Sequence, residues 1–232
     1  MVSGAAAPVR VDWSRTYRII RSIYPPIDLF EDIADPTDWD AITASDAKVN
    51  GAMNAAIGDL SKVPVARRVA GSGASWVMAP FVHCSTLRPG RFTDGSYGIY
   101  YAGDSEAVAL AETIHHHQIR MADTAEEPGW TSDFRVLVGS VDHGLEDVDA
   151  VPGVRDPLHY RPSQIEGAAL RAAGSDGVTW ESVRHPGGRC IGAFWPDVVT
   201  IPVQGAHYMY HWDGTRVDRI WKHDTRELFD IA

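Results

Sequence analysis

The chain carries an arginine, a tyrosine and a glutamate at nearly even spacing in one stretch. Arg91 is followed ten positions later by Tyr101 and, eleven positions after that, by Glu112. Tyr101 ends the strand-like run 99–101, and Glu112 falls in the helix expected immediately after it. The end of a strand and the following helix can present a guanidinium, a phenol and a carboxylate to one cleft. A guanidinium forms charge-assisted bonds to phosphate and related oxygens, so this stretch is the first candidate for a ligand site.

Ser182 is the second candidate, because it lies in the strand-like segment 177–183 just before the turn sequence His-Pro-Gly-Gly. With His185 it could form the nucleophile and base of a serine hydrolase. The chain has neither a GxSxG nucleophile elbow nor an HExxH pair, which weakens that alternative.

Two further motifs do not favour a metal site or a Rossmann-type dinucleotide site. His115, His116 and His117 are consecutive in the expected helix, where neighbouring side chains point about 100° apart and cannot share one metal ion. Glu112 and His116 are four positions apart and could both reach one metal ion, but we expect no metal. Gly71-Ser72-Gly73 lacks the third glycine and the strand-then-helix setting of a dinucleotide fingerprint.

The helices expected near the candidate residues have clear start signals. Helix 105–121 follows the N-cap candidates Asp104 and Ser105. Its apolar positions at helical spacing are Ala107, Leu110, Ala111 and Ile114. The sequence 163–166, Ser-Gln-Ile-Glu, matches a capping box and predicts a second helix that ends near Gly174.

Strand patterns between these helices indicate a single α+β domain over residues 1–232. They cover residues 15–22, 99–101, 133–142, 177–183, 189–195, 198–203, 207–212 and 215–222. Asp213-Gly214 predicts a type I′ hairpin between the last two strands.

The segment 25–80 predicts a mainly helical insert in this domain. Asp35 can cap a helix with Pro36 at its first position, and the Ala-rich stretch 44–57 has few β-branched residues. The apolar run 76–82 is short enough to be either a strand or a buried helix.

Composition excludes several classes of protein. The 232 residues suit one large domain, and 21 Lys and Arg against 31 Asp and Glu give a net charge of -10, which disfavours direct binding to nucleic acid. We see neither a basic start followed by an apolar stretch nor eighteen apolar residues in a row, so export and membrane spanning are not expected. Two widely separated cysteines give no disulfide framework, and a cytoplasmic location is expected.

The stretch that carries the first candidates resembles the signature of the RES family, which is named for an Arg, a Glu and a Ser. The pattern is Gly-Arg-aromatic, a Gly-x-Tyr-Tyr strand, and Ser-x-x-x-Ala-Leu-Ala-Glu followed by His. The resemblance spans residues 85–204, and the strand around Tyr17-Arg18 is similar to the opening strand of the family. Its family positions fall on Arg91, Tyr101, Glu112 and Ser182.

Two features depart from the family pattern. Phe92-Thr93 stands where members commonly carry Trp-Asn. Phe92 would keep a stacking surface, and the lost amide would remove a hydrogen bond. The insert 25–80 is absent from shorter members.

The resemblance implies an ADP-ribosyltransferase-like fold, in which two small antiparallel sheets form a cleft for NAD+ as the substrate. Glu112 would bind the ribose hydroxyls and stabilise an oxocarbenium-like centre. Arg91 would bind a phosphate or ribose oxygen, Tyr101 would lie against nicotinamide, and Ser182 would hold the carboxamide or a phosphate. Tyr100 is the register alternative to Tyr101, because neighbouring side chains of a strand point to opposite faces.

The resemblance also implies the toxin of a type II toxin–antitoxin pair, which breaks the nicotinamide–ribose bond and transfers ADP-ribose. The long insert favours a protein acceptor, and water or phosphate is the alternative. The implied partner is an antitoxin of the Xre or ParS type that covers the active site. A serine hydrolase and a non-enzymatic module that docks a basic partner stay open as other functions.

Overall fold

The chain folds around one mixed sheet with the strand order β1-β2-β5-β4-β3-β6-β7-β8. The computed structural model describes residues 5–31, 34–46 and 56–231. The strands are β1 (Ala7–Arg21), β2 (Tyr100–Gly103), β3 (Thr131–Asp147), β4 (Gly177–Glu181), β5 (Arg189–Ala193), β6 (Val203–Trp212), β7 (Val217–Lys222) and β8 (Glu227–Asp230). Strands β3 and β4 pair in parallel, and the other neighbours in this order pair antiparallel.

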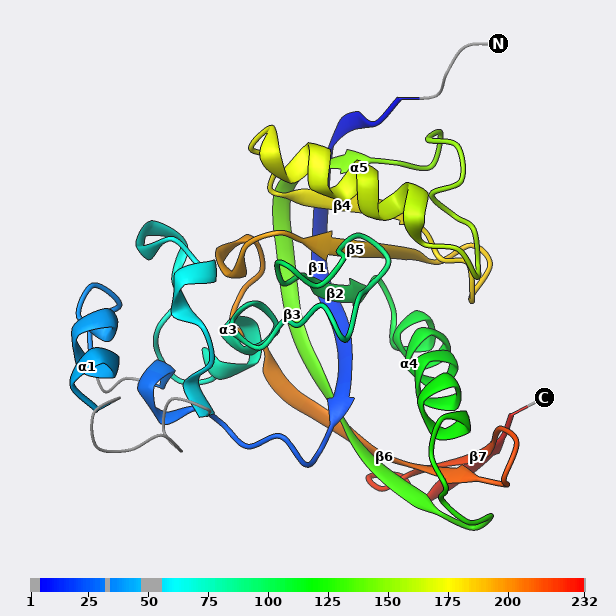
Figure 1. Ribbon diagram of the computed structural model, residues 1–232. Helices are drawn as coiled ribbons and strands as arrows, with labels where there is room; N and C mark the ends of the chain where they lie inside the picture. The colour runs from blue at the N-terminus through cyan, green and yellow to red at the C-terminus, as the bar shows by residue number, and fades with distance from the viewer. Residues whose placement is uncertain (1–4, 32–33, 47–55, 232) are drawn as a thin grey trace.

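The expectation of two small antiparallel sheets is wrong, because β1 and β3 are long enough to belong to both ends of one sheet. Their antiparallel register runs from Ala7 opposite Asp147 to Arg21 opposite Phe134. Strand β1 also pairs with β2, where Tyr17 lies opposite Gly103, so β1, β2, β5, β4 and β3 close into a ring. In Figure 1 this long pair runs the height of the molecule, with β4 and β5 near one end and β6 and β7 at the other.

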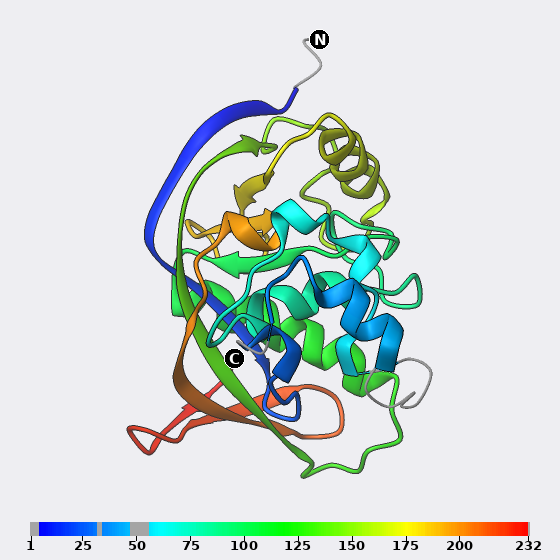
Figure 2. The ribbon, with the colours of Figure 1, turned by 90° about the vertical axis from the view of Figure 1, so that its left-hand side faces the viewer.

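Helices cover one side of the long strand pair, as Figure 2 shows. The helices are α1 (Trp39–Asp46), α3 (Ser75–Val82), α4 (Glu106–Ala122) and α5 (Arg161–Ala172), with 3-10 turns η1 (Asp28–Phe30), η2 (Leu60–Lys62), η3 (Val65–Arg67) and η4 (Pro196–Val198). None of the helices among the described residues has the length and apolar character needed to span a bilayer.

Helix α4 has nearly the predicted bounds but buries a different face. The Ser105 hydroxyl caps it by accepting a hydrogen bond from Val108 N at 3.3 Å. Val108 and Ala109 are buried together with Ile114, whereas Ala107 is exposed. The predicted stripe was therefore rotated by about one position, because the helix packs against β1, β2, β6 and β7.

The segment 25–80 contains η1, α1, η2, η3 and α3 in its described part, and it packs on the sheet through one hydrophobic cluster. Phe30, Trp39 and Met78 of the segment join Leu145 and Ile191 of the sheet in this cluster. Residues 47–55, which hold most of the predicted Ala-rich helix, lie outside the described residues.

The apolar run 76–82, which could have been a strand, forms helix α3. The Glu31 carboxylate accepts hydrogen bonds from Gly73 N (2.6 Å), Ser75 N (3.1 Å) and Ser75 Oγ (2.5 Å) just where this helix begins. Gly71 and Gly73 both have positive φ, at 112° and 85°. The Gly-Ser-Gly sequence is thus a turn that leads into α3, held by a carboxylate.

One strand prediction and one turn prediction late in the chain are wrong. The strand predicted over 198–203 does not form, because Val198 ends a 3-10 turn, Val199 makes only an isolated bridge to Val141, and Val203 already belongs to β6. The β6–β7 hairpin exists, but among the described residues Arg226 alone combines a side chain with positive φ, so Asp213 does not take the type I′ conformation.

Asp213 instead closes a longer loop between β6 and β7. Its Oδ1 accepts hydrogen bonds from the N–H groups of Thr215 and Arg216 at 2.8 Å each. The predicted capping box is also absent, because Ser163 Oγ donates to the Tyr160 carbonyl (2.9 Å) and α5 begins earlier, at Arg161.

Candidate active site

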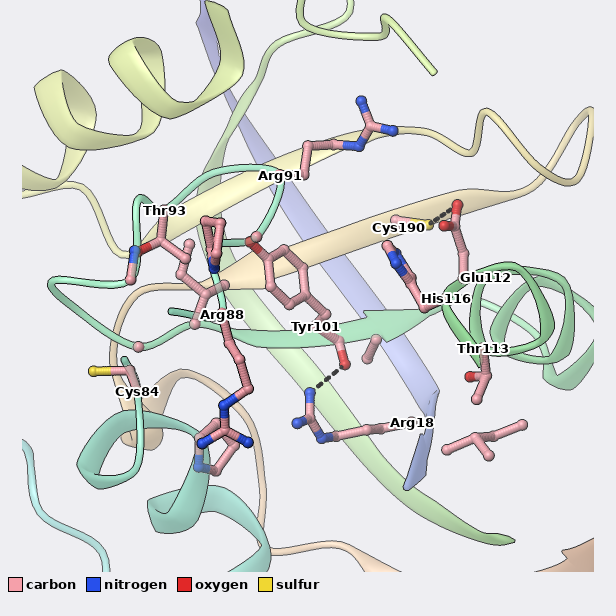
Figure 3. A pocket seen from close by; sticks show the side chains of 18 of the residues that line it. Arg18, Cys84, Arg88, Arg91, Thr93, Tyr101, Glu112, Thr113, His116 and Cys190 are labelled. Atoms are coloured by element: carbon pink, nitrogen blue, oxygen red, sulfur yellow. Dashed lines mark hydrogen bonds between the residues drawn. The ribbon is translucent and has the colours of Figure 1, made fainter. Parts of the chain in front are cut away.

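A cleft of about 440 Å³ opens between α4, strand β2 and the loop that connects α3 to β2. The charged and polar side chains that line it include Arg18, His83, Arg88, Arg91, Tyr101, Glu112, His116 and Cys190. Figure 3 shows Glu112, Thr113 and His116 reaching the cleft from α4, with Tyr101 near its centre. Residues far apart in the chain therefore meet in one hollow.

Glu112 is held in the cleft by the end of strand β4. The Ser182 hydroxyl donates to Glu112 Oε1 at 2.8 Å and accepts from the backbone N–H groups of Arg184 and His185, both at 3.1 Å. Ser182 is only 6% exposed. The hydroxyl thus has a single geometry, fixed by two amides on one side and the carboxylate on the other.

The same bonds disfavour a serine hydrolase. The Ser182 hydroxyl donates its hydrogen bond to the Glu112 carboxylate, and the group of His185 that contacts Ser182 is the backbone amide. No contact between the His185 imidazole and this hydroxyl occurs among the described residues. The serine hydrolase alternative needs the His185 imidazole within hydrogen-bond reach of Ser182, and the described contacts do not provide that pair.

Cys190 lies beside this pair, on strand β5. Its Sγ is 3.8 Å from Glu112 Oε1. Burial, followed by the charge of Glu112, raises the pKa of the Cys190 thiol far above its usual value. The thiol therefore stays protonated and does not add a second negative charge next to the carboxylate.

Tyr101 and Tyr100 point to opposite faces of β2. Tyr101 lines the cleft, its hydroxyl accepts from Phe92 N at 3.1 Å, and its ring meets Trp180 edge-on at 6.2 Å. Tyr100 is completely buried in the cluster that holds the segment 25–80. The structure accordingly brings Tyr101, and not Tyr100, to the wall of the cleft.

Arg91 lines the cleft, but its guanidinium is held by a neighbouring loop. Nη1 donates to the carbonyls of Val154 (3.0 Å) and Asp156 (2.8 Å), and the Tyr160 ring lies 4.4 Å from Cζ. In Figure 3 the guanidinium points away from Arg18 and Arg88. Among the described residues no carboxylate comes within ion-pair distance of Arg91, so its charge is balanced by carbonyl dipoles and an aromatic face.

Arg18 and Arg88 also line the cleft, although neither is among the predicted site residues. Arg18 Nη1 donates to the Tyr101 carbonyl at 3.0 Å, and its guanidinium lies over the Tyr100 ring at 4.7 Å. Burial lowers the pKa of Arg18, and its buried Nε has no partner in the described part of the chain. A charged residue inside the apolar strand run Tyr-Arg-Ile-Ile was the signal that could have identified it.

Phe92 and Thr93 shape the loop and do not offer a stacking surface to a ligand. Phe92 is fully buried, with its ring 4.7 Å from that of Trp180. The Thr93 hydroxyl donates to the Tyr97 carbonyl at 2.6 Å and accepts from Gly95 N at 3.0 Å. The expectation that Phe92 replaces a stacking tryptophan at the ligand is therefore wrong.

The three consecutive histidines diverge. His116 lines the cleft, whereas His117 is buried against Phe134 and Tyr210 on the other side of α4. Burial lowers the pKa of both His115 and His117 to about 4. Across residues 5–31, 34–46 and 56–231, no cluster of at least three His, Cys, Asp or Glu is arranged to hold a metal ion.

The cleft thus has two chemically different ends. A carboxylate positioned by a buried serine lies at one end, where it can stabilise a positive charge that develops on a bound ligand. Arg18 and Arg88 lie at the other end, where guanidinium groups can bind phosphate oxygens.

Comparisons with known proteins find one family and two similar proteins. A model of the RES domain matches residues 65–213. The chain is 28% identical over 215 residues to the protein called "Uncharacterized protein y4oC" of Sinorhizobium fredii (strain NBRC 101917 / NGR234), and the match covers 90% of this chain and 87% of that protein. A chain in the crystal structure of the M. tuberculosis MbcT–MbcA toxin–antitoxin complex is similar with a TM-score of 0.44 and 12% identity, covering 89% of this chain and 87% of the other.

Proposed function

This chain belongs to the RES domain family, and from that premise we propose that it cleaves the nicotinamide–ribose bond of NAD+ as the toxin of a toxin–antitoxin pair. The observation that carries the proposal is the Ser182–Glu112 hydrogen bond of 2.8 Å, which fixes the carboxylate at a cleft that Arg18 and Arg88 also line. This arrangement combines a fixed negative charge with a binding region for phosphate.

The proposed reaction breaks the bond between ribose C1′ and nicotinamide N1. The bonding electron pair moves to the ring nitrogen, so nicotinamide leaves as a neutral molecule and positive charge develops on the ribose. Glu112 stabilises this charge and accepts hydrogen bonds from the ribose hydroxyls, an interaction that strengthens in the transition state. A nucleophile then forms a bond to C1′ with a lone pair, and its proton passes to the solvent.

The other cleft residues bind and orient the substrate. Tyr101 offers one face of its ring to nicotinamide, and its own hydroxyl is fixed at Phe92 N. Arg18 and Arg88 bind the diphosphate, where their charges have no carboxylate partner among the described residues. Arg91 stabilises the wall of the cleft instead of binding phosphate, because carbonyls of the loop that contains Val154 already accept hydrogen bonds from its Nη1.

The test is release of free nicotinamide from NAD+, measured by chromatography for the wild type and for Glu112→Gln. The amide keeps the size of the side chain and its acceptor for Ser182 but removes the charge. We expect nicotinamide release to fall by about 100-fold or more, the usual loss when one preorganised electrostatic group is removed. Circular dichroism and thermal unfolding should be unchanged.

Glu127→Gln is the matched control, because Glu127 is exposed and lies outside the cleft. It should keep wild-type turnover. Full activity of Glu112→Gln would exclude the assigned role, and absence of nicotinamide release by the wild type would exclude the function. Labelling of Ser182 by an acyl-serine probe would instead support a hydrolase.

The acceptor of ADP-ribose is identified by repeating the assay in buffer, with phosphate and with a bacterial protein extract. Transfer to protein, which we expect, gives ADP-ribosylated bands. Release at the same rate without any protein would establish cleavage by water or phosphate.

The proposed partner is an antitoxin of the Xre or ParS type that covers the mouth of the cleft. It should co-purify with this chain and suppress nicotinamide release. Wild-type activity within the purified pair would contradict that placement.

A further inference from the structure

A second hollow of about 480 Å³ adjoins the cleft on the side away from Glu112. The two hollows share Arg18, Pro80, His83 and Arg88. The remaining wall of the second hollow consists of Ile20, Tyr24, Pro25, Pro26, Ile27, Ala56, Ser75, Trp76 and Ala79. It is therefore built by the end of β1, the segment that follows it, and helix α3.

We propose that the second hollow binds the adenosine end of NAD+, so that one dinucleotide spans both hollows. The inference rests on the proposed cleavage of NAD+ and adds a binding site for the part of the substrate that does not react. It also gives the segment 25–80 a role in substrate recognition.

The direction of the substrate follows from where the charged groups lie. Glu112 and Cys190 line the first hollow only, so the bond to be broken must lie there. Arg18 and Arg88 lie at the border, where a diphosphate that joins two nucleosides would pass between them. The rest of the molecule then extends into the second hollow.

The wall of the second hollow suits a purine and a ribose. It contains the rings of Tyr24 and Trp76 together with three prolines, and no acidic residue among those described. The Arg135 guanidinium lies 5.2 Å from the centre of the Trp76 ring and holds the indole in place. Fixed aromatic surfaces favour a planar base such as a purine.

The size of the two hollows supports a shared ligand. Each is within the range of about 300 to 1,000 Å³ in which small-molecule sites bury most of their ligand. Arg18 and Arg88 line both hollows. A ligand whose phosphates lay at these arginines but that ended there would leave the second hollow empty.

Kinetics with two substrates test the inference. Nicotinamide mononucleotide has the same scissile bond and one phosphate but no adenosine. Ala79→Phe fills the second hollow, and Trp76→Ala removes its main aromatic surface. We expect both variants to raise KM for NAD+ about 10-fold, which corresponds to about 1.4 kcal/mol. The kcat for NAD+ and the kcat/KM for the mononucleotide should stay within about twofold of the wild type.

Trp130→Ala is the control for Trp76→Ala, because Trp130 is 44% exposed and lines neither hollow. Equal changes for the two substrates, or an unchanged KM for NAD+ in Ala79→Phe, would overturn the inference. The second result would leave the hollow to another occupant, such as a side chain of a protein acceptor.

Calorimetry with ADP-ribose separates this inference from the proposed reaction. If the wild type binds ADP-ribose and Ala79→Phe weakens that binding about 10-fold, the adenosine site stands even where no nicotinamide is released. If binding is unaffected by Ala79→Phe, the adenosine site fails whatever the wild-type activity is.

Discussion

Ser182 is the residue through which strand β4 holds the carboxylate of Glu112. Its hydroxyl donates to Glu112 and accepts from two backbone amides, so Ser182→Ala removes three hydrogen bonds. We expect kcat for NAD+ to fall about 10-fold with KM within about twofold, because a carboxylate that can rotate stabilises the transition state less well. Steady-state kinetics of nicotinamide release check this split between kcat and KM.

Ser175→Ala is the matched control for this positioning role. Ser175 also bonds through its hydroxyl to backbone groups, here Gly177 O at 3.1 Å and Gly177 N at 3.3 Å, but it lies outside the cleft. Both variants should lose stability, because buried backbone groups left unpaired cost about 1 to 3 kcal/mol. An equal fall in kcat in both variants would mean that Ser182 has only a structural role.

Variants of Tyr101 can distinguish what its ring contributes to activity from what its hydroxyl contributes to stability. The hydroxyl already accepts from Phe92 N at 3.1 Å, so we assign the substrate contact to the ring. Tyr101→Phe should therefore keep activity within about threefold while lowering the free energy of unfolding by about 1 to 3 kcal/mol, because Phe92 N loses its acceptor. Chemical denaturation and nicotinamide release measure the two effects, and Tyr101→Ala, which removes the ring, should lose most of the activity.

The sequence predicts a site residue only where the residue's near neighbours along the chain determine its position. Glu112 and Tyr101 follow from a strand that leads directly into a helix, and both line the cleft. The setting of Arg91 did not follow, because its two carbonyl partners lie in a loop more than sixty positions later. Arg18 was missed because its contact with Tyr101 depends on pairing between distant strands.

At the scale of elements, the same distinction holds for the fold. The bounds of α4 were predictable because its cap and its last turn are local features of the sequence. The choice between two sheets and one depends on the pairing of β1 with β3, whose partners are more than a hundred positions apart. A period-two pattern gives the faces of a strand but not the identity of its neighbour, so this pairing could not be derived.

Helix α3 lies in close contact with the residues just before β2, and the cleft depends on this contact. A Cβ added at Gly98 would lie 2.2 Å from the carbonyl oxygen of Pro80 and 2.3 Å from the Cα of Phe81. Gly98→Ala must therefore push α3 away from β2 and should cost about 1 to 3 kcal/mol of stability, the usual penalty of overpacking. Because α3 also walls both hollows, KM for NAD+ should rise in the same variant.

Gly144→Ala provides the comparison, because a Cβ at this position on β3 meets nothing within 4 Å. Its unfolding free energy should stay within about 0.5 kcal/mol of the wild type. Denaturant titrations of the two variants side by side check the pair. Equal stability of Gly98→Ala and Gly144→Ala would mean that the loop adapts and that the close approach is not needed.

At the scale of the whole molecule, three hydrophobic clusters meet at the cleft. Ala102, Ala109 and Tyr101 each belong to, or pack against, a different cluster, and all three line the cleft. The site therefore depends on the packing of the entire domain. A change that loosens one cluster, far from the substrate, should alter the cleft and the stability together.

A histidine packed against the hydrophobic cluster that contains Phe134 and Tyr210 makes stability depend on pH. His117 is 5% exposed and packs against the rings of Phe134 and Tyr210, at 5.0 Å and 5.9 Å. Burial, with smaller effects of Arg21 and Arg120, lowers its pKa from 6.5 to about 4. In the unfolded chain the imidazole takes up a proton near pH 6.5, whereas the folded chain resists this until about pH 4.

The unfolded state therefore binds more protons between these values, and the free energy of unfolding must fall as the pH is lowered from about 6.5 to about 4. His117→Phe keeps the aromatic packing and removes the titrating group, so its stability should decline less over this range. His159→Phe, with a side chain that is 79% exposed, is the control and should follow the wild type. Denaturant titrations at intervals between pH 4 and pH 7 provide the measurement, and parallel pH curves for wild type and His117→Phe would show that another group is responsible.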